Sequence, residues 1–240
     1  MGFVKKIIKR LFYLLGYEII PYRPKILGIN PFRDINGFVT SSRPILLDVG
    51  ANKGQSVHFF KDQLPKCIIH SFEPGTTAYE ELTKNTKNYS DVYINNLALG
   101  QTSGKKTFHE NSSDDLSSFL DIDEDCPKVV NEVLVEISTV DQYCNQNNIK
   151  SIDILKIDTQ GYDLEVLKGA ISLIKHNHIH MILIEIVFWE MYKNMPPWDV
   201  TFRFLTDNNF KLISFYELTY KNHLASWTDA LFINPQYKRA

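Results

Sequence analysis

The chain has 240 residues, of which 44% are hydrophobic, and its formal net charge at pH 7 is -2. This hydrophobic content is enough for a substantial core and excludes a chain that is disordered throughout. The near-neutral charge argues against a nucleic-acid partner, because nucleic-acid-binding proteins usually carry a basic face. No apolar run reaches the roughly 20 residues that a membrane-spanning helix needs. The three cysteines, Cys67, Cys126 and Cys144, form neither a zinc pattern nor a disulfide framework, so we expect a cytoplasmic protein.

The first 17 residues have the pattern of an amphipathic helix. Apolar residues from Phe3 to Leu15 recur at helical spacing, and the opposite face is basic. Its basic residues are Lys5, Lys6, Lys9 and Arg10. Such a helix either lies on an anionic membrane surface, here the inner surface of the cytoplasmic membrane, or packs on the domain or on another subunit of a homo-oligomer. A connector rich in proline and glycine follows, so we divide the chain into residues 1–42 and a domain of residues 43–240.

From residue 45 onward, apolar strands alternate with helical patterns. We expect strands at 45–49, 68–72 and 92–95, with helices at 55–63 and 76–86 between them. This alternation predicts a parallel sheet with right-handed crossovers.

The alternation then falters and resumes. Residues 98–110 have the pattern of a hairpin or an extended excursion, and the polar residues 111–125 that of a mobile loop. We then expect strands at 133–137, 152–157, 181–186, 211–215 and 230–233, and helices at 140–147, 163–174 and 198–206.

Acidic residues and glycines follow the first two of these strands. Asp48, Gly50 and Gly54 end the first strand, and Glu73 ends the second. Glycines permit a sharp strand-to-helix turn, and an acid on the second strand suits the ribose of a nucleoside-bearing cofactor. The glycine spacing differs from the G-x-G-x-x-G of dinucleotide sites, which favours S-adenosylmethionine over NAD. An NAD-dependent oxidoreductase or epimerase remains the rival enzyme, and a simple strand-end turn remains the structural alternative.

A third acidic residue, Asp158, ends the strand at 152–157 within the segment from Ile152 to Gly169. The carboxyl edge of an open α/β sheet faces the ligand crevice, which places Asp158 beside Asp48 and Glu73. The alternative is that Asp158 caps the helix that follows.

Together these segments resemble the FkbM family of methyltransferases. The resemblance covers about residues 44–215 and implies a Rossmann-like class I methyltransferase fold, an α/β fold with helices on both faces of a mostly parallel seven-stranded sheet whose last strand is antiparallel. It also implies O-methylation with S-adenosylmethionine as cofactor, frequently on sugars or polyketide-type natural products. The cofactor-binding residues expected on this basis are Asp48, Gly50, Asn52, Gly54, Glu73, Pro74 and Ala98.

One departure from the family pattern concerns the third motif. The family commonly has D-x-E-G there, whereas this chain has the neutral Gln160 before Gly161. A catalytically degenerate methyltransferase fold that serves as a scaffold therefore stays open as an alternative.

Methylation of an alcohol needs a base near the acceptor hydroxyl, because a neutral alcohol is a poor nucleophile. Asp158 is the first candidate by position, followed by Glu185 and His109. Glu185 could instead bind substrate hydroxyls, and His109 has the setting of an ordinary surface histidine. The acceptor that we expect is a hydroxyl of a sugar, a glycan or a natural-product precursor.

Three further patterns each have a simple structural interpretation. The alternating His176, His178 and His180 fit a solvated connector better than a metal site, so we expect no metal. An acidic cluster fits a soluble lid over the ligand better than a cation site. An aromatic cluster suits either a sugar or the packing of a helix. The acidic cluster consists of Asp114, Asp115 and residues 121–125. The aromatic cluster consists of Phe188, Trp189, Tyr192 and Trp198.

Overall fold

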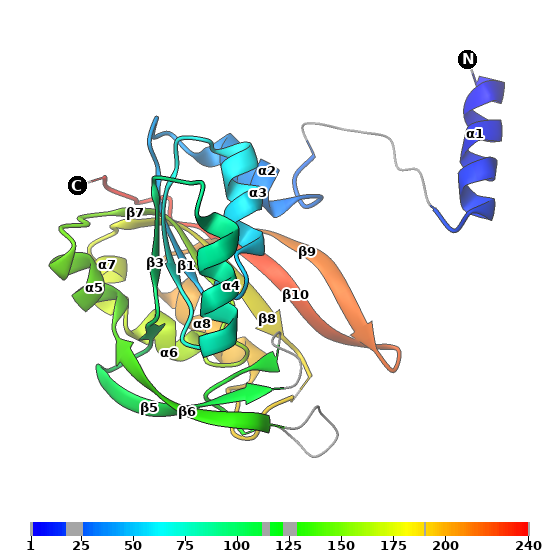
Figure 1. Ribbon diagram of the computed structural model, residues 1–240. Coiled ribbons are helices and arrows are strands. Elements are labelled where there is room, and N and C mark those ends of the chain that lie inside the picture. The colour runs from blue at the N-terminus through cyan, green and yellow to red at the C-terminus, as the bar shows by residue number, and fades with distance from the viewer. Residues whose placement is uncertain (1, 18–25, 112–115, 122–128, 190, 240) are drawn as a thin grey trace.

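The computed structural model describes residues 2–17, 26–111, 116–121, 129–189 and 191–239 (Figure 1). Within these residues the centre of the fold is a seven-stranded sheet with the order β3-β2-β1-β7-β8-β10-β9. The strands are β1 (Ile45–Val49), β2 (Ile68–Phe72), β3 (Val92–Asn95), β7 (Ile152–Ile157), β8 (Ile179–Val187), β9 (Lys211–Lys221) and β10 (Leu224–Ile233).

Most neighbours in this sheet are parallel. β1 pairs in parallel with β2 on one side and with β7 on the other. The pairs β2–β3 and β7–β8 are also parallel. β10 runs antiparallel to both β8 and β9. The expected mostly parallel sheet with an antiparallel last strand is therefore confirmed, and it brings the carboxyl ends of β1, β2, β7 and β8 to one edge.

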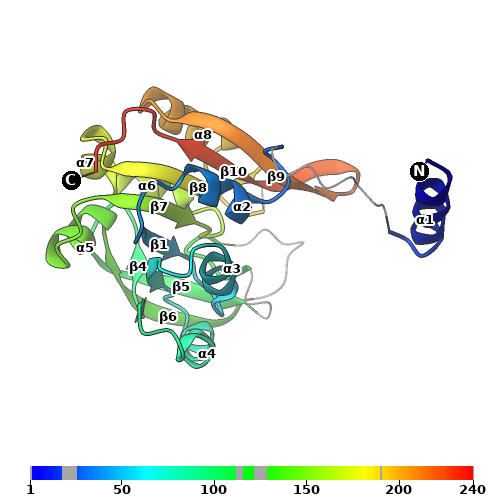
Figure 2. The same cartoon turned by 90° about the horizontal axis from the view of Figure 1, so that it is seen from above.

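Helices cover both faces of the sheet (Figure 2). Successive side chains of a strand point to opposite faces, so Leu46 lies in one apolar cluster with Phe60, and Leu47 lies in another with Val166. The first layer holds α2 (Pro31–Phe38), α3 (Gln55–Gln63) and α4 (Thr76–Thr86). The second holds α5 (Val140–Gln146), α6 (Asp163–Lys168), α7 (Ile171–Lys175) and α8 (Trp198–Asp207).

Two described helices precede β1, and they differ in their contacts. α2 packs on the domain, because Ile35 is fully buried beside Phe60 and the Tyr216 hydroxyl donates to Asp34 over 3.1 Å. α1 (Gly2–Leu14) is the expected amphipathic helix, and every described side chain from Val4 to Tyr17 is exposed. Among the described residues no helix has the length and apolar character to cross a membrane. The division of the chain after residue 42 stays a prediction.

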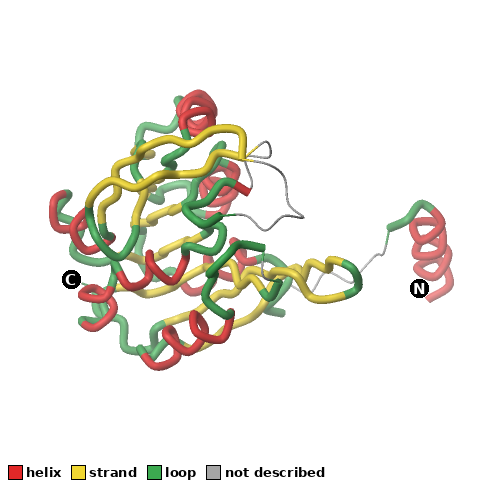
Figure 3. The backbone as a smooth tube through the Cα atoms, turned by 90° about the horizontal axis from the view of Figure 1, so that it is seen from below, coloured by secondary structure: helices red, strands yellow, loops and turns green. Residues whose placement is uncertain are grey.

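A second, three-stranded sheet in the described part of the chain has the order β4-β6-β5. Its strands are β4 (Ala98–Leu99), β5 (Gly104–Asn111) and β6 (Val129–Ser138), and Figure 3 shows β5 and β6 as a curved pair outside the central sheet. The excursion expected at 98–110 therefore supplies two strands that pair with the strand expected at 133–137. Most of the expected acidic loop, including Asp114, Asp115 and residues 122–125, lies outside the described residues.

Three elements differ from the sequence prediction for clear physical reasons. The helix expected at 163–174 is split into α6 and α7, because the Asp141 carboxylate accepts from the backbone N–H groups of Ser172 and Leu173 and so starts a new helix. β9 and β10 extend well beyond the expected 211–215 and 230–233 and form a hairpin that projects past the rest of the sheet (Figure 1). Asn222 and His223 have positive φ angles of 51° and 65° at its turn, as a tight two-residue hairpin loop requires.

Candidate active site

A cavity of about 630 Å³ lies at the carboxyl ends of β1, β2, β7 and β8. This is the size range of small-molecule sites, and the location is where open α/β sheets bind ligands. Its wall includes the expected residues Gly50, Asn52, Glu73, Pro74, Ala98, Asp158 and Glu185. The segments that carry the sequence motifs therefore meet around one space.

The turn after β1 is held against two neighbouring strand ends. The N–H groups of Gly50 and Ala51 both donate to the carbonyl oxygen of Phe72, over 3.1 and 3.0 Å. Gly50 has a φ of +80°, and a Cβ there would lie 1.8 Å from the carbonyl oxygen of Asp158. Only glycine fits this position, because the first and third motifs approach each other backbone to backbone.

Glu73 is fixed in the cavity wall by the backbone. Its Oε2 accepts from the N–H of Asn52 over 2.9 Å, and its Oε1 accepts from the N–H of Gly75 over 2.8 Å. The residue is only 6% exposed, although it lines the cavity. Because each carboxylate oxygen has two lone pairs, the oriented group keeps acceptor capacity for the hydroxyl groups of a ligand.

Asp48 lies one layer behind the cavity wall. It is fully buried, and Lys156 Nζ is 3.3 Å from its Oδ1 and 3.5 Å from Oδ2 of Asp158. Burial raises the pKa of Asp48, and the Lys156 ammonium opposes that rise. Burial by itself would lower the pKa of Lys156, but the facing carboxylates of Asp48 and Asp158 raise it overall, so the lysine is charged. Asp48 therefore acts on the cavity through Lys156, which forms part of the wall.

Gln160 connects the two acidic candidates for catalysis. Its Nε2 donates to Asp158 Oδ1 over 3.0 Å and to Glu185 Oε2 over 3.3 Å. The Tyr192 hydroxyl donates to Gln160 Oε1 over 3.1 Å, which orients the amide. Gln160 also has a positive φ of 53°, a conformation that residues other than glycine, asparagine and aspartate adopt only where their surroundings hold them in it. The neutral residue of the third motif is therefore built into the site.

The two carboxyl groups have different environments. The Asp158 side chain is 37% exposed and has Lys156 as a counter-ion. Burial, and then the charge of Asp158, raise the pKa of Glu185 well above its usual value. Burial therefore favours the protonated form of Glu185, whereas Asp158 lies closer to solvent beside an ammonium group, and such a difference in environment lets neighbouring carboxyl groups take different roles.

Asp158 does not cap the helix that follows it. The N-cap of α6 is Tyr162, which makes no side-chain cap hydrogen bond. Asp163 instead accepts from the N–H groups of Thr159 and Gly161, over 2.9 and 3.2 Å. The carboxylate of Asp158 therefore stays available to the cavity.

Three predicted site residues do not line the cavity, and the buried Asp48 behind the wall is one of them. Gly54 is the N-cap of α3 with a φ of +90°, and a Cβ there would crowd Leu82 at 3.0 Å, so it serves the backbone turn. His109 lies on β5 between Asp121 and Glu132, at 3.5 and 3.4 Å. The structure therefore does not bring His109 to the cavity that Asp158 and Glu185 line.

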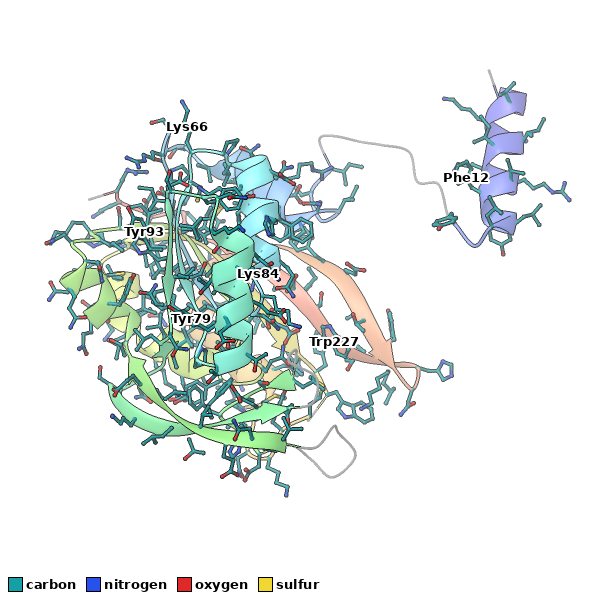
Figure 4. All side chains as sticks on the ribbon, viewed as in Figure 1. Phe12, Lys66, Tyr79, Lys84, Tyr93 and Trp227 are labelled. Carbon is teal, nitrogen blue, oxygen red and sulfur yellow. The ribbon has the colours of Figure 1, made fainter. Side chains whose placement is uncertain are left out.

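The sequence analysis missed several residues of the wall. Lys156 had a signal, since a lysine inside a buried apolar strand needs a carboxylate partner. Three aromatic residues of the wall had no local signal: Trp227 on β10, which is labelled in Figure 4, Phe108 on β5, and Phe119, whose ring packs on Phe108. They reach the cavity only because the hairpin and the three-stranded sheet border it.

Apart from Tyr192, which contacts Gln160, the other patterns that were named in the sequence pack away from the cavity. The rings of Phe188 and Trp198 meet edge to face at 5.5 Å, as core packing predicts. His180 stacks on Tyr237 at 4.6 Å. Within the described ranges, no group of three histidine, cysteine or acidic side chains is placed to hold a metal ion.

Residues 48–212 match the family model described as the methyltransferase FkbM domain. The chain belongs to the FkbM methyltransferase family. It is 23% identical over 150 residues to the 2-O-methyltransferase NoeI of Sinorhizobium fredii, which is 58% of this chain and 62% of NoeI. It is 24% identical over 160 residues to the hexuronic acid methyltransferase AglP of Haloferax volcanii, which is 65% of this chain and 59% of AglP. The chain thus spans less than two thirds of these relatives' lengths.

Solved structures show the same fold. The crystal structure of methyltransferase FkbM from Methylobacillus flagellatus KT has a TM-score of 0.54 at 15% identity, covering 86% of this chain and 48% of that chain. An rRNA methylase from Streptococcus thermophilus has a TM-score of 0.50 at 11% identity, covering 91% and 100%. At these identities the likeness concerns the fold alone, and the class I methyltransferase fold expected from the sequence is confirmed.

Proposed function

We propose that this protein is an S-adenosylmethionine-dependent O-methyltransferase that methylates a hydroxyl of a sugar, a glycan or a related natural-product precursor. The observation that carries the proposal is the convergence of Glu73, Asp158 and Glu185 on one cavity. Lys156 also lies in the wall of this cavity, and Asp48 lies behind it. The FkbM family supports methyl transfer. The names of two relatives, a 2-O-methyltransferase and a hexuronic acid methyltransferase, support a sugar hydroxyl as the acceptor.

The residues of the cavity fit the cofactor. S-adenosylmethionine, when bound, supplies a methyl group on a sulfonium cation. Glu73 ends the second strand with its carboxylate already oriented by two N–H groups, so it is suited to accept hydrogen bonds from ribose hydroxyls. The acidic wall also suits a cation. By contrast, the N–H groups of Gly50 and Ala51 already bind Phe72, which disfavours the pyrophosphate of NAD at this turn.

The acceptor side of the cavity carries the acid–base pair. In this proposal Asp158 accepts the proton of the acceptor hydroxyl at a carboxylate oxygen as the new bond to carbon forms. Gln160 holds Asp158 in place through its amide, and Tyr192 holds Gln160. Burial raises the pKa of Glu185 and so favours its protonated form, which in this proposal donates a hydrogen bond to a neighbouring hydroxyl of the acceptor.

Positioning supplies much of the remaining rate acceleration, because methyl transfer is an in-line displacement. The apolar part of the wall, with Phe108, Phe119 and Trp227, limits water in the cavity and offers aromatic faces to the apolar face of a sugar ring.

Calorimetric titration with S-adenosylhomocysteine tests the cofactor assignment, and a fluorescence titration with NADH tests its rival. We expect heat with the first ligand and no signal with the second. Transfer of a labelled methyl group to a panel of sugars and uronic acids then tests the reaction. A folded protein that binds NADH but not S-adenosylhomocysteine would refute the proposal. Cofactor binding without transfer to any acceptor of the panel would instead favour the scaffold alternative.

A further inference from the structure

The amphipathic helix α1 has two separate faces that are both exposed. Its apolar face includes Val4, Ile7 and Leu11, which are 62%, 53% and 57% exposed. An apolar stripe on a soluble domain is normally buried against the core. No described side chain of α1 from Val4 onward is even partly buried, so the stripe has no cover within the described chain.

The charges on the polar face of α1 destabilise the isolated helix. Lys5 and Lys9, and likewise Lys6 and Arg10, are four residues apart and so form like-charge neighbours on the helix surface. The first turn contains no acidic residue to complement the helix dipole, and the last turn contains no basic one. Isolated helices shorter than about 12–15 residues are marginal in water, and α1 has 13. An external surface must therefore supply the stability of this helix.

The charge on α1 indicates which surface that is. Residues 1–17 contain four basic residues and no acidic one, although the whole chain has a net charge of -2, so the rest of the chain has an excess of acids. A second copy of α1 would cover the apolar face but would add like charges to those already present. A bilayer with anionic headgroups covers the apolar face and neutralises the basic face together.

We propose that α1 docks this methyltransferase on an anionic lipid surface, with its apolar stripe between the headgroups and its basic face in contact with their negative charges. The acidic body then stays in solution, because the same surface repels it. The docking is independent of the cavity, since it uses residues that precede the catalytic fold.

Co-sedimentation of the full chain with vesicles tests the proposal. Phosphatidylcholine vesicles with about 30% phosphatidylglycerol should retain the protein, pure phosphatidylcholine should retain little, and raising the salt should weaken retention. The variant K5Q/K6Q/K9Q/R10Q should lower the partition coefficient by at least about tenfold, because each basic group near such a surface contributes roughly a factor of five. The variant I7Q/L11Q, which leaves the charge unchanged, should lower it by a similar factor.

A matched control removes the same charge from the body. The α/β body has four exposed lysines that suit this control, namely Lys66, Lys84, Lys87 and Lys175. Figure 4 labels Lys66 and Lys84 on the body, and it labels Phe12 on α1. The variant K66Q/K84Q/K87Q/K175Q should bind vesicles as the unmodified chain does, within about twofold. Circular dichroism and urea midpoints establish that all variants keep the fold.

Three results would overturn the proposal. The unmodified chain could stay in the supernatant with anionic vesicles, or the control could lose as much binding as the α1 variants. Light scattering could also show a dimer that the I7Q/L11Q change dissociates, with no vesicle binding, which would make a second copy the occupant of the apolar face. None of these results depends on methyl transfer, so they are distinguishable from a failure of the proposed function.

Discussion

Replacing Lys156 by methionine tests the buried charge pair that Lys156, in the cavity wall, forms with Asp48. The side chain of Asp48 is fully buried, and Lys156, which is 8% exposed, is the cation that faces it at 3.3 Å. In Lys156→Met the aspartate loses this counter-ion. It must then either remain charged in an apolar setting or take up a proton.

The loss in free energy of unfolding can be worked out for the case in which Asp48 takes up a proton. Protonating an aspartate of ordinary pKa at pH 7 costs about 4 kcal/mol, since each pH unit above the pKa adds about 1.4 kcal/mol. This agrees with the roughly 3–5 kcal/mol measured when one partner of a buried ion pair is removed. The folded variant then binds one proton more than the unfolded chain above about pH 4, so its stability falls as pH rises. We expect a loss of about 4 kcal/mol at pH 7 but only about 1.5 kcal/mol at pH 5.

Urea denaturation followed by tryptophan fluorescence at both pH values measures this difference. The double variant D48N/K156M removes both charges and should recover at least about half of the loss. The control Lys168→Met breaks a half-exposed pair with Glu165, 2.6 Å long, and should cost less than about 1 kcal/mol. A loss below about 1 kcal/mol at pH 7, or an equal loss at both pH values, would refute the reasoning.

The remaining predictions concern catalysis, cofactor affinity, acid stability and packing. Asp158→Asn should lower kcat by about 10²–10⁴-fold in a methyl-transfer assay and leave the affinity for S-adenosylhomocysteine nearly unchanged, so an unaltered kcat would exclude Asp158 as the base. Glu73→Gln removes one acceptor and should weaken that affinity by roughly tenfold in calorimetry; no change would remove Glu73 from the cofactor site. Burial lowers the pKa of His70 to about 4, so the folded protein binds fewer protons than the unfolded chain between this value and pH 6.5, and stability falls as pH falls through that window. In His70→Gln the free energy of unfolding should fall by about 2 kcal/mol less over this pH window than in the parent chain. Parallel curves of stability against pH for the two proteins would contradict the lowered pKa of His70. Gly169→Ala would place a Cβ 2.0 Å from the carbonyl oxygen of Gly100 and should cost at least about 2 kcal/mol in urea denaturation, which a normal urea midpoint would contradict.

Local signals in the sequence were sufficient for the main strands and for the methyltransferase family. β1, β2, β3 and β7 have the expected bounds, because each apolar run ends at an acid, an asparagine or a turn residue. Parallel strands in α/β folds also end at one edge, so the convergence of Glu73 and Asp158 could be expected from strand order alone. The family resemblance rests on the same three motifs, so the sequence alone was sufficient to predict it.

Contacts between segments that are distant in the sequence could not be predicted from such local patterns. The pairing of β5 with β6 sets His109 between Asp121 and Glu132 and away from the cavity, and neither strand carries a local sign of its partner. The two-residue turn at Asn222 and His223 lengthens the last hairpin and brings Trp227 to the cavity wall.

The sequence by itself determined the strand–helix order, the position of the acidic residues at strand ends and the separation of charge on α1, since each depends on neighbours within a few residues. Only the tertiary structure decided that Lys156 neutralises Asp48, that Gln160 bridges Asp158 and Glu185, and that Gly54 supports a turn. The physical reason is that ionisation and hydrogen bonding depend on distances and burial across the fold, which no local periodicity encodes.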